Sequence, residues 1–306
     1  MSDSQMPSLT DYDRLVEPHK RALKKLELDL GFFLNDVGQI DVFSITSRVK
    51  ARQSAMTKSA RLGIPVHDLD DLAGLRIVVG TSPELPVVER FFSRQEVGND
   101  LRILKHQKIA RESGYRATHL VVELRGSYQS SVFPGRVEIQ LQTIFEHAFN
   151  FLSRSWNYKQ PWRLSPSWSS TFVHISSLLA EVEAAASSLH VEVIAASASS
   201  DSSPLKPHSL KMLLAEEFDE ALDIADCVDA CRMYMDLGYV TNGQLRAFFR
   251  NSEIAELYAF SRSGTASAER AGPLSAMGRH SFWSLFGTRI GSPGLREILE
   301  HLRDDI

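Results

Sequence analysis

The chain has 306 residues, of which 43% are hydrophobic and 24% charged, and its formal net charge is −4. These values are typical of a soluble globular protein that is long enough for two domains. The acidic balance argues against bulk binding of nucleic acid, and the sequence contains no run of about 18 apolar residues that would span a membrane. Because the N-terminus also lacks the apolar segment of a secretory signal peptide, we expect a cytoplasmic protein with no membrane partner.

The hydrophobic pattern predicts helices and strands in an order typical of an α/β (α+β) fold. Helices are expected over residues 11–36, 46–62 and 84–94. Strands are expected over residues 74–80, 101–110, 117–124 and 136–142. The loop between the last two strands contains two glycines and a proline, which favours a hairpin with a long connection. The sequence therefore predicts a mixed sheet flanked by helices, in a domain over residues 1–165.

The segment Thr143–Glu146 is a Ser/Thr-x-x-Glu capping box, which predicts a helix that continues to about Trp156, near the end of this domain.

The second half of the chain, residues 166–306, has a helical pattern and no recognisable motif. A long Ala- and Ser-rich helix is expected over residues 169–196, and a linker over 197–207. Further helical segments are expected from Ser209 onward, around 243–262 and around 293–303. This half of the chain predicts a helical region without indicating its role.

The two cysteines of the chain, Cys227 and Cys231, lie four residues apart in a helical pattern. No cluster of cysteine or histidine accompanies them, so a zinc site is not expected. We interpret them as small core residues.

The helix expected over 46–62 has a positive stripe and an apolar face. Lys50, Ser54, Lys58 and Arg61 follow one another at helical spacing, and Arg48 lies near the helix start. A positive stripe is commonly a solvated face. This one, however, has no acidic residue between Val42 and Val66 to pair with. Unpaired positive charge of this kind would suit a polyphosphate ligand.

Two carboxylates are associated with predicted strands: one lies just before a strand and the other lies within a strand. Asp71 is the last of three aspartates before the strand that starts near Gly74, and Glu138 lies in the middle of an apolar strand. Asp71 could be a turn cap and Glu138 could lie on a solvated sheet face. Alternatively, the two could hold Mg²⁺ through oxygen and accept a proton from a hydroxyl group. A carboxylate within a strand is costly without a partner, which favours the second interpretation.

The stretch SGYRATHLVVEL, residues 113–124, begins with polar residues and continues as an apolar strand. Side chains alternate along a strand, so Tyr115 and His119 lie on the same face and Leu120 and Val122 on the core face. The pair could lie on an exposed edge, or it could form a platform for a ligand. The sequence also has neither a GxxxxGK[ST] loop nor a GxGxxG loop, so side chains and metal would have to hold any triphosphate.

Four segments taken together resemble one family. They are RVKARQSAMTK (48–58), DLAGLRIVV (71–79), RESGYRATH (111–119) and VEIQLQT with EHAF and NYK (137–159). In this order and spacing they resemble the RelA/SpoT-type alarmone synthetase domain, in the manner of the small alarmone synthetases. The resemblance implies a nucleotidyltransferase-like fold and a Mg²⁺-dependent transfer of pyrophosphate from ATP to the 3′-hydroxyl of GDP or GTP.

The resemblance also implies roles for individual residues. Those expected to bind ATP are Arg48, Lys50, Ser54 and Lys58. Those expected to bind the acceptor are Tyr115, which would stack on the base, with His119 and Arg111. Asp71 and Glu138 would be the catalytic and metal-binding carboxylates. Only about 40 residues precede the matching region, so no N-terminal hydrolase domain is expected.

The sequence departs from the family pattern at four places. Gln142 stands where the family usually has arginine, Phe149 where it has tryptophan, Arg154 where it has histidine, and Ala110-Arg111 where it has proline-lysine. Two alternatives therefore stay open. One is a toxin-like relative that modifies adenine nucleotides or the 3′ end of tRNA, and the other is a nucleotide sensor without catalysis. Relatives often form homo-oligomers, but no interface signature is visible.

Overall fold

The structure is a computed structural model that describes residues 9–37, 40, 42–110, 114–129, 135–158, 166–219 and 222–251. The chain divides into two compact units. The first comprises residues 1–36 and 40–188, and the second comprises residues 37–39 and 189–306. The boundary between the units falls within a long helix, whereas the sequence predicts a domain boundary at residue 165, which stays a prediction.

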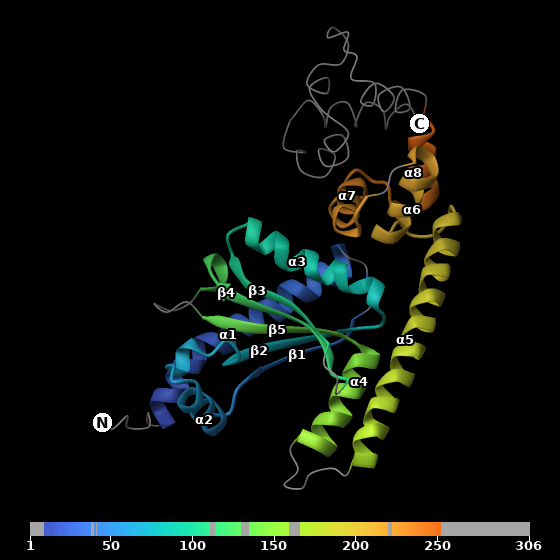
Figure 1. Cartoon of the computed structure of the whole chain (residues 1–306). Coiled ribbons are helices and arrows are strands. Elements are labelled where there is room, and N and C mark those ends of the chain that lie inside the picture. The colour runs from blue at the N-terminus through green and yellow to red at the C-terminus, as the bar shows by residue number, and fades with distance from the viewer. Residues whose placement is uncertain are drawn as a thin grey trace, which may run out of the picture. The chain divides into compact units, whose positions relative to one another are not determined.

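The first unit is built on a five-stranded mixed sheet (Figure 1). Its strands are β1 (Val42–Val49), β2 (Ala73–Val79), β3 (Leu101–Ala110), β4 (Arg116–Leu124) and β5 (Arg136–Thr143). Their order across the sheet is β1-β2-β5-β4-β3, and of these neighbours only β2 and β5 run parallel. The antiparallel pairing of β4 with β5 confirms the predicted hairpin. The parallel pair sets Gly74 beside Glu138 in the middle of the sheet.

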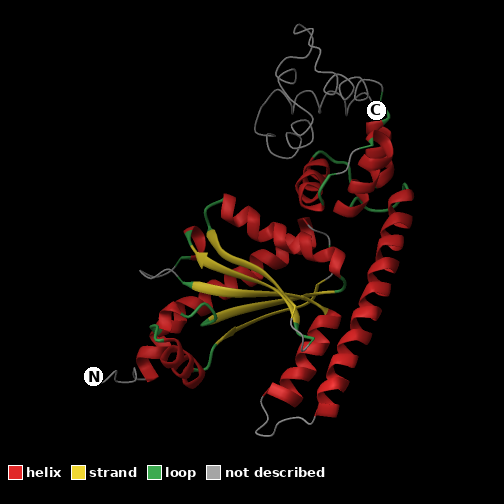
Figure 2. Cartoon of the chain, viewed as in Figure 1, coloured by secondary structure: helices red, strands yellow, loops and turns green. Residues whose placement is uncertain are grey.

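Within the described residues, five α-helices belong wholly or in part to this unit (Figure 2). They are α1 (Leu9–Phe32), α2 (Arg52–Leu62), α3 (Leu85–Val97), α4 (Ile144–Ser153) and α5 (Pro166–Ser199). Helices α1 and α3 pack on the apolar face of the sheet, where Leu30, Phe92 and Ile139 are fully buried. The rings of Phe33, just after α1, and Phe91, on α3, are 5.4 Å apart. This face is therefore the hydrophobic core.

The start of the helix predicted over 46–62 is wrong. Residues Val42–Val49 form strand β1, and the helix begins only at Arg52. The segment contains four β-branched residues, which favour an extended chain, and β1 gains a full antiparallel ladder with β2. Arg48 is consequently on a strand and Lys50 in the short connection to α2. The positive stripe is thus shared between a strand end and a helix.

The polar face of the sheet is only partly covered. Helix α4 begins at Thr143 with the predicted capping box: Thr143 accepts a hydrogen bond from the Glu146 amide, and Glu146 accepts one from the Thr143 amide. The helix packs over one end of the sheet near Gln142, whose side chain contacts His147. Glu138 and Gln140, further along β5, alternate with the buried core residues and point to the same side as Gln142. This leaves an open polar surface beside α4.

The second unit contains the end of α5 and three short helices, α6 (Pro207–Phe218), α7 (Ile224–Asp236) and α8 (Asn242–Phe249). The helical pattern that starts at Ser209 is interrupted after Phe218, where Asp219 adopts a left-handed conformation with φ 55°. Cys227 and Cys231 are fully buried free thiols in α7, which confirms them as core residues. The helix predicted over 293–303 and most of the one around 243–262 lie outside the described residues.

The long Ala- and Ser-rich helix predicted over 169–196 is α5, which extends a few residues further at each end. Of the helices that the structure describes, none combines the length and the apolar character needed to cross a membrane.

Candidate functional site

A cleft of about 1200 Å³ opens over the polar face of the sheet in the first unit. Its walls come from the end of β1, from α2, from the turn before β2, from β4 and β5, and from the end of α4. The volume exceeds the range typical of a site for one drug-sized ligand, about 300–1,000 Å³. The cleft is therefore large enough for more than one small molecule.

One corner of the cleft is fixed by backbone contacts of Lys50. The Lys50 amide donates a 2.8 Å hydrogen bond to the Leu72 carbonyl, and the Lys50 carbonyl accepts a hydrogen bond from the Tyr12 hydroxyl of α1. Tyr12 and Leu72 belong to a small apolar cluster that also contains Ala55 of α2. Packing of α1 and α2 thus brings a positive residue beside Asp71, which is distant from it in the sequence.

Asp71 receives two ammonium groups on a single oxygen. The Nζ atoms of Lys50 and Lys58 both lie 2.8 Å from Asp71 Oδ2. Burial alone would raise the pKa of the Asp71 carboxyl group, but the hydrogen bonds and charges of the two lysines outweigh burial, so the pKa lies below its ordinary value. The other oxygen, Oδ1, is buried and has no hydrogen-bond partner among the described residues. Asp71 is therefore an anion with one oxygen still available.

Glu138 lies in the middle of the polar face and is held by neutral or titratable partners. Its Oε1 lies 3.3 Å from His119 Nδ1, and its Oε2 accepts a 2.7 Å hydrogen bond from Gln140. Arg76 in turn donates to Gln140 Oε1 at 3.2 Å. Burial would raise the pKa of Glu138, but the contacts with His119 and Gln140 outweigh burial and the repulsion from Asp71, so the pKa is lowered. Glu138 is therefore ionised at neutral pH.

Tyr115 is connected to Glu138 through His119. The Tyr115 hydroxyl and His119 Nε2 are 2.9 Å apart, so the two rings that the alternation places on one face also contact each other. The backbone before Tyr115 turns at Gly114, with φ +89°. The Gly114 carbonyl accepts a 3.3 Å hydrogen bond from Ser176 of α5. Helix α5 therefore braces the turn from which Tyr115 projects.

The predicted site residues that the structure describes all lie at this cleft. The predicted donor-binding residues Arg48, Lys50, Ser54 and Lys58 line it together with Asp71, Tyr115, His119 and Glu138. Arg111 lies outside the described residues. Residues separated by up to 90 positions in the sequence are thus brought to one surface, while their individual roles stay predictions.

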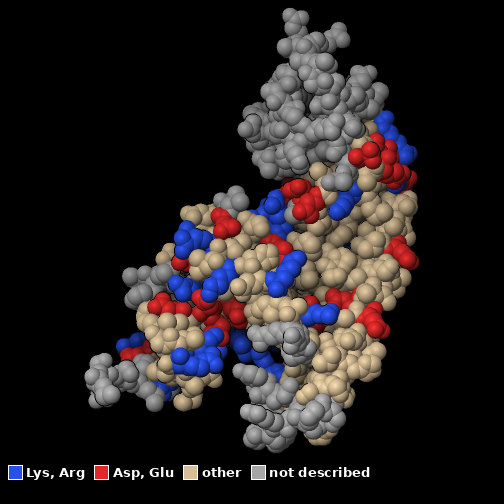
Figure 3. All heavy atoms as spheres, in the orientation of Figure 1, with Lys and Arg blue, Asp and Glu red and all other residues tan. Residues whose placement is uncertain are grey.

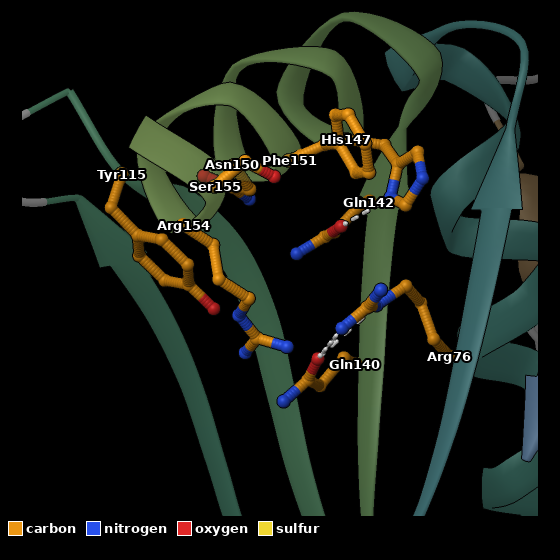
Figure 4. Close-up of a pocket in the computed structure, with 9 residues that line it drawn as sticks. All are labelled: Arg76, Tyr115, Gln140, Gln142, His147, Asn150, Phe151, Arg154 and Ser155. Carbon is orange, nitrogen blue, oxygen red and sulfur yellow. Dashed lines mark hydrogen bonds between the residues drawn. The ribbon is translucent and has the colours of Figure 1, made fainter. Parts of the chain in front are cut away.

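The sequence analysis assigns no site role to Arg76 or Gln140, and it treats Arg154 only as a departure from the family pattern that could compensate for the charge missing at Gln142. These residues line a smaller cavity of about 290 Å³ next to α4. In Figure 4, Arg154 lies beside Tyr115 on one side of this cavity, and Arg76 lies on the opposite side. Two of them carried a signal in the alternation of their strands. Gln140 is two residues after Glu138, so it must share its face, and Arg76 is a charged residue inside the apolar strand β2.

Gln142 is one of the departures from the family pattern, and it is buried in the site. It is 1% exposed, and its Oε1 lies 3.3 Å from His147 Nδ1. A long cation at this position would have to reach out of a buried contact with α4. The amide instead joins the first turn of α4 to the sheet, in the wall of the cavity that lies next to α4 (Figure 4).

Comparison with known protein families gives one match in this unit. The family model described as "Region found in RelA / SpoT proteins" matches residues 47–162. A curated relative, GTP pyrophosphokinase YjbM of Bacillus subtilis (strain 168), is 30% identical over 159 residues, which cover 48% of this chain and 74% of the relative. The matched region contains every residue of the cleft described above.

Comparison with solved structures gives the same fold. The small alarmone synthetase 1 of Bacillus subtilis superposes with a TM-score of 0.54 at 24% identity, over 60% of this chain and 97% of that one. Two further structures of that protein, bound to its product pppGpp and to AMPCPP, each give a TM-score of 0.51, at 24% and 21% identity, and cover 60% of this chain and 98% of theirs. The mixed five-stranded sheet with its flanking helices is therefore the fold of an alarmone synthetase.

Proposed function

The chain belongs to the RelA/SpoT family, and from this premise we propose that it is a pyrophosphokinase that transfers pyrophosphate from ATP to the 3′-hydroxyl of GDP or GTP, making (p)ppGpp. The observation that carries the proposal is the meeting of two carboxylates, two lysines and a tyrosine at one cleft. The related synthetase has been solved with a guanine product, pppGpp, and with an ATP analogue, AMPCPP, which supports nucleotides as the ligands of this cleft.

The residues present fit a magnesium ion. Oxygen atoms are the ligands that Mg²⁺ prefers, and it is usually held by one or two carboxylates together with substrate phosphates. Asp71 Oδ1 is buried without a hydrogen-bond partner among the described residues, so a cation would satisfy it. Those residues contain no group of three or more His, Cys, Asp or Glu that could form a complete metal cage. Asp71 and Glu138 would therefore share the ion with the nucleotides, where it would neutralise phosphate charge.

The transfer itself needs a base for the acceptor. The 3′-oxygen attacks the β-phosphorus of ATP, the bond from that phosphorus to the oxygen bridging to the α-phosphate breaks, and AMP leaves with the electron pair. Glu138 takes the proton of the 3′-hydroxyl, for which its lowered pKa keeps it ionised at neutral pH. Gln140 and His119 hold the carboxylate in place from both sides.

The remaining residues would bind the two nucleotides. The ring of Tyr115 offers a face on which the acceptor base can stack. The ammonium groups of Lys50 and Lys58, which contact Asp71, would be shared with the phosphates of ATP, and Arg48 and Ser54 line the same wall. Because His119 joins Tyr115 to Glu138, binding of the acceptor and orientation of the base are connected in one chain of contacts.

Over the described residues of the first unit, the face in view in Figure 3 shows no continuous positive surface of the kind that a tRNA acceptor would need. Figure 3 shows Lys and Arg side chains interspersed with Asp and Glu over the face of the first unit in view. Several positive side chains of the first unit are paired, for example Lys105 with Asp70 and Arg102 with Glu123. A macromolecular acceptor would be better served by a continuous positive surface.

A transfer assay tests the proposal. Purified protein is incubated with γ-labelled ATP and Mg²⁺, separately with GDP, GTP, AMP, ATP and bulk tRNA, and with Glu138→Gln as the control enzyme. We expect label on GDP or GTP with the wild type and none with the variant. Label on an adenine nucleotide or on tRNA would instead assign a toxin-like activity. Binding of nucleotides without any transfer would indicate a sensor.

A further inference from the structure

Arg154 reaches the cleft from a wall that carries none of the predicted phosphate-binding residues. It begins the π-helical turn Arg154–Tyr158 that follows α4. Its side chain lines the main cleft and two smaller cavities. One is the cavity of Figure 4, which Tyr115 also lines, and the other, of about 230 Å³, is also lined by Asp71 and Glu138. In Figure 4 it extends from the end of α4, beside Tyr115, toward Gln140 and Arg76. Arg154 therefore lies where the acceptor region and the carboxylates meet.

The charge of Arg154 is not neutralised by the part of the chain that the structure describes. No carboxylate there pairs with Arg154 or with Arg48, whereas Lys50 and Lys58 both pair with Asp71. Arg76 bonds a neutral amide, Gln140. The pKa of Arg76 is lowered, first by burial and then by the positive charges of Arg154 and Arg48, although Tyr115 and Glu138 oppose this. The three guanidinium groups thus repel one another around the same space.

A structural role for Arg154 has little support. The residue is half-buried, so it is not a side chain that simply extends into solvent. Its guanidinium group has no hydrogen bond within the described residues that would hold α4 or the following turn in place. Clustered cations in a partly buried cavity repel one another strongly, and an anionic ligand would remove that cost.

We propose that Arg154 is a catalytic residue that binds the pyrophosphoryl group during its transfer, from the α4 side of the cleft, while Lys50 and Lys58 act from the α2 side. This inference rests on the proposed function. A guanidinium group can donate two parallel hydrogen bonds to phosphate oxygens, which suits the charge that spreads over them in the transition state. Arg154 keeps its proton throughout: the bonds that form and break, and the proton transfer to Glu138, are those of the transfer described above.

The kinetic test compares Arg154→Gln and Arg154→Lys with the wild type. Arginines that stabilise phosphoryl transfer contribute about 10³–10⁵-fold to kcat. We expect Arg154→Gln to lower kcat by about 10³-fold and to raise KM for ATP by about tenfold, and Arg154→Lys to recover part of both losses. A third variant, Arg154→Gly, leaves space for a free guanidinium ion. Added guanidinium should therefore restore turnover to Arg154→Gly, whereas it should not restore turnover to Glu138→Gln. The matched control is Arg21→Gln, an exposed arginine of α1, which should keep wild-type kinetics.

Arg154→Gln with kcat within about threefold of the wild type would overturn the inference, since a transition-state contact cannot be so weak. A rise in KM for ATP with kcat unchanged, or loss of activity together with a lowered melting temperature, would do the same. Arg154→Lys provides a check on folding, because it keeps the charge and the length of the side chain.

A binding measurement separates this inference from the proposed function. Inorganic triphosphate is titrated into the wild type, Arg154→Gln and Lys58→Gln by calorimetry, with no turnover required. The wild type could bind triphosphate without transferring pyrophosphate, while Arg154→Gln binds triphosphate about tenfold more weakly. In that case the proposed reaction fails but the phosphate contact of Arg154 stands. If Lys58→Gln weakens binding and Arg154→Gln does not, or if the wild type does not bind triphosphate, the contact of Arg154 is refuted.

Discussion

The two carboxylates of the cleft lie in the same cavity but have different kinds of partner. Asp71, in the turn before β2, has two lysines on one oxygen and no hydrogen-bond partner among the described residues on the other. Glu138, in the middle of β5, has a histidine on one oxygen and an amide on the other. Permanent cations stabilise an anion that never changes its charge, which suits Asp71 if it only holds the metal, whereas Glu138 would both help to hold the metal and accept a proton. Neutral and titratable partners suit a group that gains and loses a proton.

The largest effect is expected at Glu138. Glu138→Gln keeps the shape of the side chain and removes its basicity, so we expect kcat to fall by about 10³-fold, in the range typical of a lost general base. The melting temperature should change little. Glu89→Gln, a carboxylate of α3 outside the cleft that contacts His106, is the control and should keep full activity. Turnover by Glu138→Gln at a rate near that of the wild type would remove Glu138 from the catalytic role.

At Asp71 the comparison predicts a different response. Asp71→Asn removes the negative charge that Lys50 and Lys58 share and one oxygen that is available to a cation. We therefore expect kcat to fall by about 100-fold and the Mg²⁺ concentration for half-maximal activity to rise. Stability should also fall by about 1–3 kcal/mol, because two partly buried lysines are left without their partner. Urea unfolding and Mg²⁺ titration of activity measure the two effects. An unchanged Mg²⁺ requirement would contradict the assignment of Asp71 as a metal ligand.

A substitution at Gly114 should affect Glu138 and leave Asp71 unaffected, because Gly114 positions Tyr115, which contacts Glu138 through His119. A Cβ atom at Gly114 would lie 2.5 Å from Ser176 Oγ and 2.7 Å from Phe149 Cζ, at a φ that favours glycine. We expect Gly114→Ala to destabilise the protein by about 1–3 kcal/mol and to raise KM for the acceptor, while the Mg²⁺ requirement is unchanged. The double variant with Ser176→Gly should recover part of the stability. Kinetics that respond equally for ATP and for the acceptor would show that Gly114 does not act through Tyr115.

The smallest effect is on the dependence of stability on pH. The folded-state pKa values of Asp71 and Glu138 lie below their ordinary values of 3.8 and 4.5. Their contribution to stability is therefore fully present above those ordinary values, and it is lost as the pH falls through the lower folded-state values. Urea unfolding between pH 7 and pH 3 should show a shallower loss of stability in Asp71→Asn than in the wild type. Parallel curves for the two proteins would contradict the coupling of Asp71 to its lysines.

The sequence predicts much of the sheet because the strands β2, β4 and β5 carry clear apolar runs or alternation. The same alternation predicts that Tyr115 and His119 share a face, as the structure shows. The sequence pattern gives the wrong prediction for β1. Positive residues at helical spacing suggest a helix there, but the segment forms a strand because it pairs with β2. Local pattern is weaker evidence than a ladder of hydrogen bonds that only the folded sheet provides.

Other parts of the site could not be predicted because they depend on contacts between distant segments. Nothing near Lys50 in the sequence indicates that its amide bonds to Leu72, yet this bond brings Lys50 to Asp71. The absence of acidic residues near the positive stripe suggests that its lysines are unpaired, and the fold supplies Asp71 from another segment. Arg154 appears in the sequence only as a departure from a family pattern, and its position at the cleft comes from the packing of α4.

The contact between α5 and the turn at Gly114 sets a limit on how far the protein can be shortened. Phe172 of α5 packs edge-on against Phe149 of α4, with ring centres 6.4 Å apart, and Ser176 bonds the Gly114 carbonyl one turn further along. A fragment that ended at residue 165 would lose both contacts and expose Phe149, which is 2% exposed in the folded chain. A minimal version of the protein for crystallography or NMR should therefore retain α5 at least through Ser188, although the matching family region ends at residue 162.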